Sequence, residues 1–459
     1  MNKIKISLIA LVVGLTSTAI IAQTDSAMIR KIYSEALSNG KSYSNLDYLS
    51  NKIGGRLSGS PQAQQSVEWA FKAMKEAGAD TVYLQECMVP HWVRGAKEVG
   101  KVICSNPKDN RELPVCALGG SIATPADGLT ASIIEVMGVK QLEVLGKEKI
   151  KGKIVFFNEP MDPTFIETFN AYGKAVEQRW AGPSEAAKFG AVGVVTRSCT
   201  LRQDDYPHTG SMNYKDSLNK IPACCVSTNG ANWLSTELKK DKDLKFFLKM
   251  SCDKLPDVKS YNVVGEIRGS ENKNEFIVVG GHLDSWDTGQ GAHDDGAGVV
   301  QSIEVIRIFK ALGIKPKCTI RAVAFMNEEN GGRGGKKYAE LALKNKEKHI
   351  AAIESDAGGF TPRGFSSDVT PVVKAKLKSW RPLFEPYGVY DFDRDGSGSD
   401  ISPLKEQNVP CIELRPDSQR YFIHHHTPID TFEYVNQREL ELGDAATAAL
   451  IWMIDNYGL

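Results

Sequence analysis

The stretch Phe276-Ile277-Val278-Val279-Gly280-Gly281-His282-Leu283-Asp284 joins an apolar run to an imidazole and a carboxylate. Its β-branched residues and the glycines that end the run are typical of a buried strand. An amphipathic helix is expected downstream, because apolar residues recur there at helical spacing: Val299, Ile303, Ile306 and Phe309. Further strands are expected over residues 261–267, 318–326, 350–353 and 411–414, and a closing helix over 440–454. This alternation predicts an α/β fold with a mixed, mostly parallel sheet sandwiched by helices.

The composition is that of an ordinary globular protein. The chain has 459 residues, 42% of them hydrophobic, and its 56 Lys and Arg residues balance 56 Asp and Glu residues. At roughly 150 residues per domain, the length predicts two or three domains. A net charge of zero without a long basic run argues against a nucleic-acid partner. The nine cysteines form no Cys-x-x-Cys pair, which argues against a thiolate zinc ribbon.

The first 22 residues are predicted to be a cleaved signal peptide. Lys3 and Lys5 precede an apolar run over residues 6–21, and Ala22 stands before a polar stretch. The alternative is a membrane anchor, which is disfavoured because Gly14 and residues 16–18 dilute the apolar run. We therefore expect an exported protein, periplasmic or extracellular, without membrane attachment after cleavage.

The middle of the chain changes character and predicts a second domain. Residues 116–253 contain short apolar strands, such as 154–157 and 191–195, separated by Gly/Pro turns and polar loops. This segment shows no ionisable residues at ligand-like spacing. We interpret it as a smaller, β-rich domain inserted into a catalytic domain of residues 23–115 plus 254–459.

Ionisable residues follow several of the predicted strands. They are His282 and Asp284, Asp294 at the start of a helix, Glu328 and Glu329, Asp356, and the histidines 424–426. Each motif alone has an ordinary explanation, since an acid at a helix start can be a cap and paired glutamates are usually solvated. Together they would be costly to bury without a partner of opposite charge. A bound cation resolves this cost, and imidazole with carboxylate ligands suits zinc.

These blocks resemble a known family. Residues 281–287 and 290–296, then Asn327-Glu328-Glu329, Glu354-Ser355-Asp356 and His426-Thr427 with Asp430-Thr431, are similar to the zinc exopeptidase family of secreted aminopeptidases. With residues 54–60 upstream, they most resemble its carboxypeptidase Q branch. The inserted segment resembles the protease-associated domain of related exopeptidases. The resemblance covers nearly the whole chain after the signal peptide.

The resemblance implies two Zn²⁺ ions per chain and a role for each site residue. The metal positions are His282, Glu329, Asp356 and His426, with Asp294 as the carboxylate that bridges both ions. Glu328 falls on the general acid/base position, and Asp284 on the residue that orients His282. Because three histidines are consecutive, His425 is the second choice for the ligand at His426. His293 is interpreted as structural or as a support for a ligand.

The function predicted from this site is that of an exported dinuclear zinc exopeptidase acting on dipeptides or short peptides. Either terminus could be attacked, so carboxypeptidase, dipeptidase and aminopeptidase activities all stay open. The Gly/Ser loop over residues 395–400 could receive a peptide group or be a simple surface turn, and Trp286 could line the pocket or belong to the core. A homodimer is implied only by analogy with carboxypeptidase Q. The alternatives are a glutaminyl cyclase-like acyltransferase and a non-catalytic binding ectodomain.

Overall fold

The strand that contains Phe276 lies at the centre of a seven-stranded sheet. The computed structural model describes residues 24–459, so the signal peptide predicted over residues 1–22 lies outside the described residues. The strands of this sheet are, in spatial order, β1 (Thr81–Val93), β10 (Asp253–Ile267), β12 (Cys318–Phe325), β11 (Asn272–His282), β13 (Lys348–Glu354), β15 (Cys411–Pro416) and β14 (Pro362–Asp368).

The sheet is mixed, as predicted. Strands β12, β11, β13 and β15 pair in parallel, whereas β1, β10 and β14 add antiparallel edges. The expected α/β fold is confirmed, with parallel pairing confined to the four central strands. In such sheets ligands bind beyond the carboxyl ends of the parallel strands.

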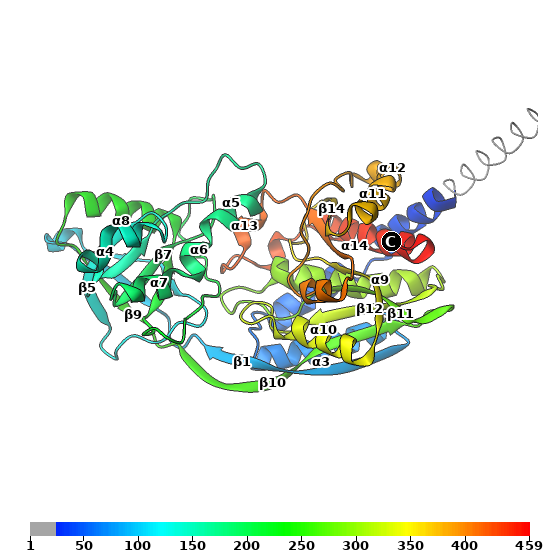
Figure 1. Ribbon diagram of the computed structural model, residues 1–459, viewed down its shortest axis with the longest axis horizontal. Coiled ribbons are helices and arrows are strands. Elements are labelled where there is room, and N and C mark those ends of the chain that lie inside the picture. The colour runs from blue at the N-terminus through cyan, green and yellow to red at the C-terminus, as the bar shows by residue number, and fades with distance from the viewer. Residues whose placement is uncertain (1–23) are drawn as a thin grey trace, which may run out of the picture.

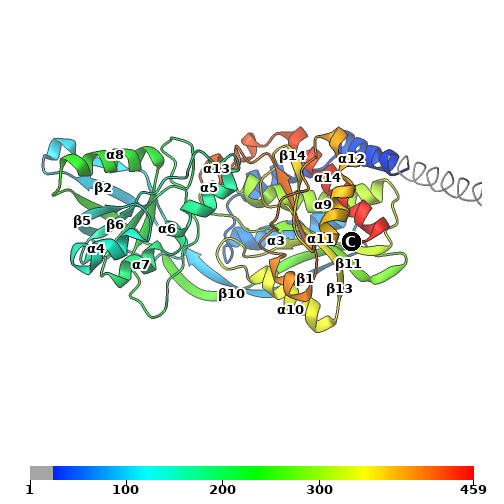
Figure 2. The ribbon, with the colours of Figure 1, turned by 45° about the horizontal axis from the view of Figure 1, so that its top comes forward.

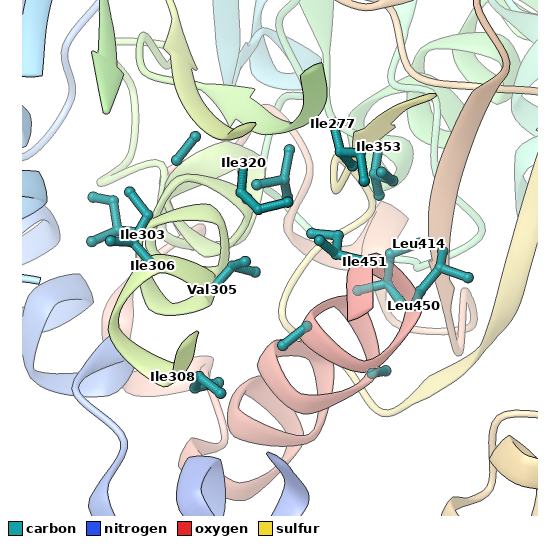
Figure 3. Packing of buried hydrophobic residues seen from close by; sticks show 14 of the residues in the cluster. Ile277, Ile303, Val305, Ile306, Ile308, Ile320, Ile353, Leu414, Leu450 and Ile451 are labelled. Atoms are coloured by element: carbon teal, nitrogen blue, oxygen red, sulfur yellow. The ribbon is translucent and has the colours of Figure 1, made fainter. Parts of the chain in front are cut away.

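Helices cover both faces of this sheet. Three helices pack on one face: α3 (Pro61–Glu76), α9 (Ala297–Ala311) and α14 (Gln437–Tyr457). Ile277 of β11 points into this layer with Ile303 of α9 and Ile451 of α14 (Figure 3). Val278 belongs instead to the core under α10 (Arg333–Asn345), on the opposite face. Burial on both faces explains why β11 reads as a continuous apolar run.

The remaining helices of this part of the chain lie around the same sheet. The helix over residues 24–39 contributes Ile29, Ile32 and Tyr33 to the core. The others are α2 (Ser42–Tyr48), α11 (Pro371–Ser379), α12 (Arg381–Phe384) and α13 (Tyr421–His424).

A second sheet stands at the other end of the molecule (Figure 1). Its eight strands are, in spatial order, β3 (Arg111–Leu113), β2 (Val99–Ile103), β9 (Lys245–Lys249), β5 (Leu129–Val136), β6 (Ile154–Phe157), β7 (Gly193–Arg197), β8 (Ala223–Val226) and β4 (Val115–Ala117). The helices of this region are α4 (Gln141–Ile150), α5 (Thr168–Ala175), α6 (Glu177–Trp180), α7 (Gly182–Lys188) and α8 (Thr228–Lys240). Strands β1 and β10 carry the chain out to this sheet and back (Figure 2).

The limits of the second sheet differ from the boundary predicted at residue 116. Strand β1 stays paired with β10 up to the partners Val93 and Asp253. Strands β2 and β3, at residues 99–113, then belong to the second sheet, although the sequence analysis assigned them to the catalytic domain. These strands are short and separated by a polar turn at residues 106–110. The sequence therefore contains no long apolar run there that would predict a buried strand.

We expect Ile320→Ala in β12 to lower the free energy of unfolding by about 2–5 kcal/mol, because it removes buried methyl groups and leaves a cavity. Ile320 is 0% exposed, whereas Val372 of α11 is 80% exposed and serves as the matched control. Val372→Ala should change the unfolding free energy by less than about 0.5 kcal/mol. Urea unfolding followed by circular dichroism measures both, and equal effects of the two variants would contradict this assignment of the core.

Candidate active site

The residues predicted as metal ligands meet at the carboxyl edge of the first sheet. Each comes from a different segment: His282 ends β11, Glu329 follows β12, Asp356 follows β13, Asp294 precedes α9, and His426 follows α13. Their donor atoms form overlapping groups in which all atoms lie within 4.8 Å of one another. The structure therefore brings together all five positions that the sequence analysis selected.

Asp294 lies between the two imidazoles. Its Oδ1 is 3.2 Å from Nε2 of His282, and its Oδ2 is 3.2 Å from Nε2 of His426. A second carboxylate accompanies each imidazole: Asp356 Oδ1 lies 3.5 Å from His282, and Glu329 Oε2 lies 3.2 Å from His426. One central carboxylate thus faces two separate histidine–carboxylate pairs.

Backbone carbonyls fix the orientation of both imidazoles. Nδ1 of His282 donates to the carbonyl oxygen of Asp284 at 2.9 Å, and Nδ1 of His426 donates to that of Thr209 at 3.1 Å. In a neutral imidazole the lone pair is then on Nε2, which points at the carboxylates. Acceptor atoms would face acceptor atoms, so this arrangement requires a positive charge between them.

The pKa values show the same demand for positive charge. Burial lowers the pKa of His426, but Glu329 and Asp294 outweigh it and raise the pKa to about 9. Burial, reinforced by Asp294, raises the pKa of Glu329 to about 8. Burial also raises the pKa of Asp356 to about 6, and its Oδ1 has no hydrogen-bond partner among residues 24–459. Imidazole nitrogens and carboxylate oxygens converging in this way are the donor set that zinc prefers.

His425 lies farther from the centre than His426. Its Nε2 is 3.9 Å from Asp294 Oδ2, and its ring stacks on that of His426 at 3.5 Å. His425 also belongs to one of the groups of converging donor atoms. The shorter distances favour His426, which was the first choice from the sequence.

The carboxylate of Asp284 has a different partner from the one expected. Its Oδ1 is 3.9 Å from His282, too far for a hydrogen bond, and accepts instead from the backbone N–H groups of Asn327 at 2.6 Å and Glu328 at 3.0 Å. The backbone carbonyl of Asp284 is what orients His282. Burial raises the pKa of the Asp284 carboxyl to about 6.

Glu328 and Glu329 diverge, as their adjacency required. Glu329 is buried, and its Oε1 accepts from the backbone N–H of Trp286 at 3.2 Å. Glu328 is half-buried and lines the cleft in front of the cluster. Asn327, with φ of 74°, turns the backbone immediately before the two glutamates.

Two acidic residues escaped the sequence analysis. Asp295 is buried and accepts from the backbone N–H groups of His282 and Gly298. Asp430 accepts from the N–H groups of His293 at 2.7 Å and Asp294 at 3.1 Å, and so fixes the backbone of the central carboxylate. Asp295 directly follows Asp294, and Asp430 lies four residues after His426. The sequence analysis used the second spacing only to choose among the three histidines.

The upstream block at residues 54–60 supports the same loop. Arg56 is fully buried and donates to the carbonyl oxygens of Leu283, Gln290 and Gly291. The guanidinium therefore ties together the segment that runs from the end of β11 to Asp294.

Other candidate residues have structural positions. His293 is buried, accepts from the N–H of Gly359 at 3.2 Å and stacks on Phe360, which agrees with a structural interpretation. Trp286 is 3% exposed and packs edge-to-face on Trp92, so it belongs to the core between the two sheets.

In the Gly/Ser loop, Ser399 is exposed and lines the cleft. The Gly396 N–H and the Ser397 hydroxyl, in contrast, donate to the carboxylate of Asp368. The loop is therefore anchored beside the site.

A cleft of about 850 Å³ lies in front of the cluster, and both sheets contribute to its wall. The first supplies Asp294, Glu328, Glu329, Asp356 and His426, and the second region supplies Tyr172, Arg179 and residues 211–214. Helix α5 lies beside α13 in both ribbon views (Figures 1 and 2), and the ring of Phe169 stacks on that of Tyr421. The sequence analysis found no site residue in this region, because its polar residues are scattered.

Within residues 24–459, no helix combines the length and hydrophobicity that crossing a membrane requires.

The comparisons with known proteins agree with this geometry. Residues 262–451 match the model of peptidase family M28. Mouse carboxypeptidase Q is 33% identical over 90% of this chain and 85% of its own length. A solved Peptidase M28 precursor from Shewanella amazonensis is 33% identical with a TM-score of 0.89, covering 95% of this chain and 97% of that one. A zinc aminopeptidase from Bacillus subtilis shares the fold at 22% identity, with a TM-score of 0.63 over 90% of this chain and 94% of that one.

The predicted resemblance to the zinc exopeptidases and to carboxypeptidase Q is confirmed, and so is the predicted class of enzyme, a zinc metalloexopeptidase. The chain therefore belongs to peptidase family M28.

Proposed function

We propose that this protein is an exported exopeptidase with two zinc ions, which hydrolyses dipeptides or short peptides. The observation that carries the proposal is the position of Asp294, whose two oxygens face two different imidazoles. His282 with Asp356 would hold one ion, His426 with Glu329 the other, and Asp294 would bridge them. When bound, zinc supplies a Lewis acid that makes a water molecule a stronger nucleophile at neutral pH.

Glu328 is proposed as the general base and acid. It faces the cleft, whereas its neighbour Glu329 turns into the cluster. Glu328 would take the proton of the attacking water and pass it to the nitrogen of the leaving amine. Asp284, through the backbone N–H groups of Asn327 and Glu328, would position the base.

The size of the cleft favours small substrates. Its volume of about 850 Å³ falls in the range that encloses drug-sized ligands, and two walls restrict the approach of a long chain. Residues of the second sheet would form an inserted, protease-associated-like domain that closes one side. Export to the periplasm or extracellular space, and assembly into a homodimer, stay predictions from the sequence and its resemblance.

The first prediction concerns the number of metal ions. We expect two zinc ions per chain in the wild-type protein, about one in His282→Ala or His426→Ala, and fewer than one in Asp294→Ala, because only the central carboxylate serves both positions. Mass spectrometry of the metal content after dialysis against buffered zinc measures these ratios. One zinc ion in the wild type, with cyclisation of amino-terminal glutamine, would instead favour the glutaminyl cyclase-like alternative.

The second prediction separates the adjacent glutamates. Glu328→Gln should keep the wild-type zinc content and lose about 10²–10⁴-fold in kcat, because it removes the proton acceptor but no ligand. Glu329→Gln is the matched variant and should lose zinc. Metal content and turnover of a dipeptide panel are measured on the same samples. The assignment is wrong if Glu328→Gln loses zinc while its activity per bound ion stays high.

The third prediction tests how Asp284 acts. Asp284→Asn keeps an oxygen that can accept both backbone N–H groups, so kcat should stay within about tenfold of wild type. Asp284→Ala leaves the two N–H groups without an acceptor and should lower kcat by about 100-fold or more. Equal losses in Asn and Ala variants would show that the charge of Asp284, rather than its contact with the Glu328 backbone, matters.

A further inference from the structure

Arg179 of α6 is a buried cation without an anionic partner. The residue is 6% exposed and lines the cleft. Two neutral groups accept from it, the hydroxyl of Tyr172 at 2.7 Å and the carbonyl oxygen of Thr209 at 3.3 Å, while its Nε has no partner in the described part of the chain. None of the ion pairs within residues 24–459 involves this guanidinium. Burying a charge in this way is costly unless an anion completes the site.

The guanidinium lies next to the proposed metal cluster. A Cβ built on Gly210 would stand 2.5 Å from Cζ of Arg179 and 2.7 Å from Nδ1 of His426. Both side chains also donate to the same carbonyl oxygen, that of Thr209. The cation is therefore beside the His426 end of the cluster, on the wall supplied by the second sheet.

The other cations of the cleft do not share this environment. Lys220 and Lys254 line the cleft but are exposed, so water screens their charge. The carboxylates of the cleft wall near the cluster are committed to the metal positions or, at Glu328, to proton transfer. Arg179 is thus placed to attract an anion that enters with the substrate.

Tyr172 adds a second donor at the same place. Its ring lines the cleft, and burial raises the pKa of its hydroxyl to about 12, so the group stays protonated at neutral pH. The hydroxyl oxygen accepts from Arg179, which leaves its own hydrogen free to donate. A planar guanidinium with a neighbouring hydroxyl is well matched to the two oxygens of a carboxylate.

We infer that Arg179 and Tyr172 bind the free C-terminal carboxylate of the peptide substrate. The inference rests on the proposed function and deepens it by naming the terminus that is recognised. A terminal carboxylate lies one residue, about 3.8 Å in Cα spacing, beyond the last peptide bond. With that carboxylate on Arg179, the last peptide bond would lie against the cluster and Glu328. The enzyme would therefore release the C-terminal residue and reject internal bonds.

The test compares a dipeptide with its C-terminal amide, using the best substrate of a dipeptide panel and the zinc-loaded full-length enzyme. For wild type we expect kcat/KM on the amide to be about 10- to 100-fold lower, mainly through KM, because a charged hydrogen-bonded pair is lost. Arg179→Gln should lower kcat/KM on the free acid by a similar factor and change the amide little. The ratio of acid to amide should then approach one.

Matched variants separate recognition from structural support. Arg197 is equally buried at 6% exposure and bonds to Asn158 and Asn232, but it does not line the cleft, so Arg197→Gln should keep the wild-type ratio. Arg179→Lys keeps the positive charge but loses the paired N–H donors of the guanidinium. This variant should retain part of the preference for the free acid over the amide. Tyr172→Phe should lower activity on the acid several-fold and leave the amide unchanged.

The inference is overturned if wild type cleaves acid and amide equally, or if Arg179→Gln weakens both alike together with zinc content. The second result would mean that Arg179 only supports His426 through Thr209. Should Arg179→Gln not fold, Arg179→Lys and Tyr172→Phe decide on the same ratio. If wild type hydrolyses neither form, the proposed function fails. Calorimetric titration of the same acid and amide into Glu328→Gln still measures carboxylate recognition without turnover, and equal affinities would refute it.

Discussion

Two imidazoles and three carboxylates crowd together in the candidate active site, and their burial is favourable only when positive charge lies among them. The Nε2 atoms of His282 and His426 are both turned toward Asp294 because backbone carbonyls take the hydrogens of their Nδ1 atoms. If both imidazoles were neutral, the lone pairs of their Nε2 atoms would face the oxygens of the shared carboxylate. Burying this arrangement without positive charge would be unfavourable. The surrounding structure holds these side chains together as a candidate metal site.

The site is held together by backbone contacts more than by side-chain packing. The carboxylate of Asp430 accepts from the backbone N–H groups of His293 and Asp294, and Arg56 donates to three backbone carbonyls of the loop before Asp294. Gly281 lets this loop approach β11, because a Cβ there would stand 2.4 Å from the carboxylate of Asp295. These contacts fix the backbone of Asp294 without using the oxygens of its own carboxylate.

The sequence predicted that these side chains gather at one edge because the strands that carry them are parallel. His282, Glu329 and Asp356 follow β11, β12 and β13, and ends of neighbouring parallel strands meet at one edge. The role of Asp284 could not be predicted, since its backbone carbonyl orients His282 and a carbonyl is present in every residue. Arg179 was not predicted for another reason. It lies in the short helix α6, beside the second sheet, and only the tertiary fold brings it close to His426. The strands over residues 99–113 were too short to be recognised.

The region of the second sheet contacts the candidate active site, because the loop between β7 and β8 provides the carbonyl that orients His426. Thr209 accepts from His426 and also from Arg179, so one peptide group contacts both the metal side and the proposed substrate side of the cleft. Moving this sheet away would remove the acceptor of His426 and separate Arg179 from the cluster.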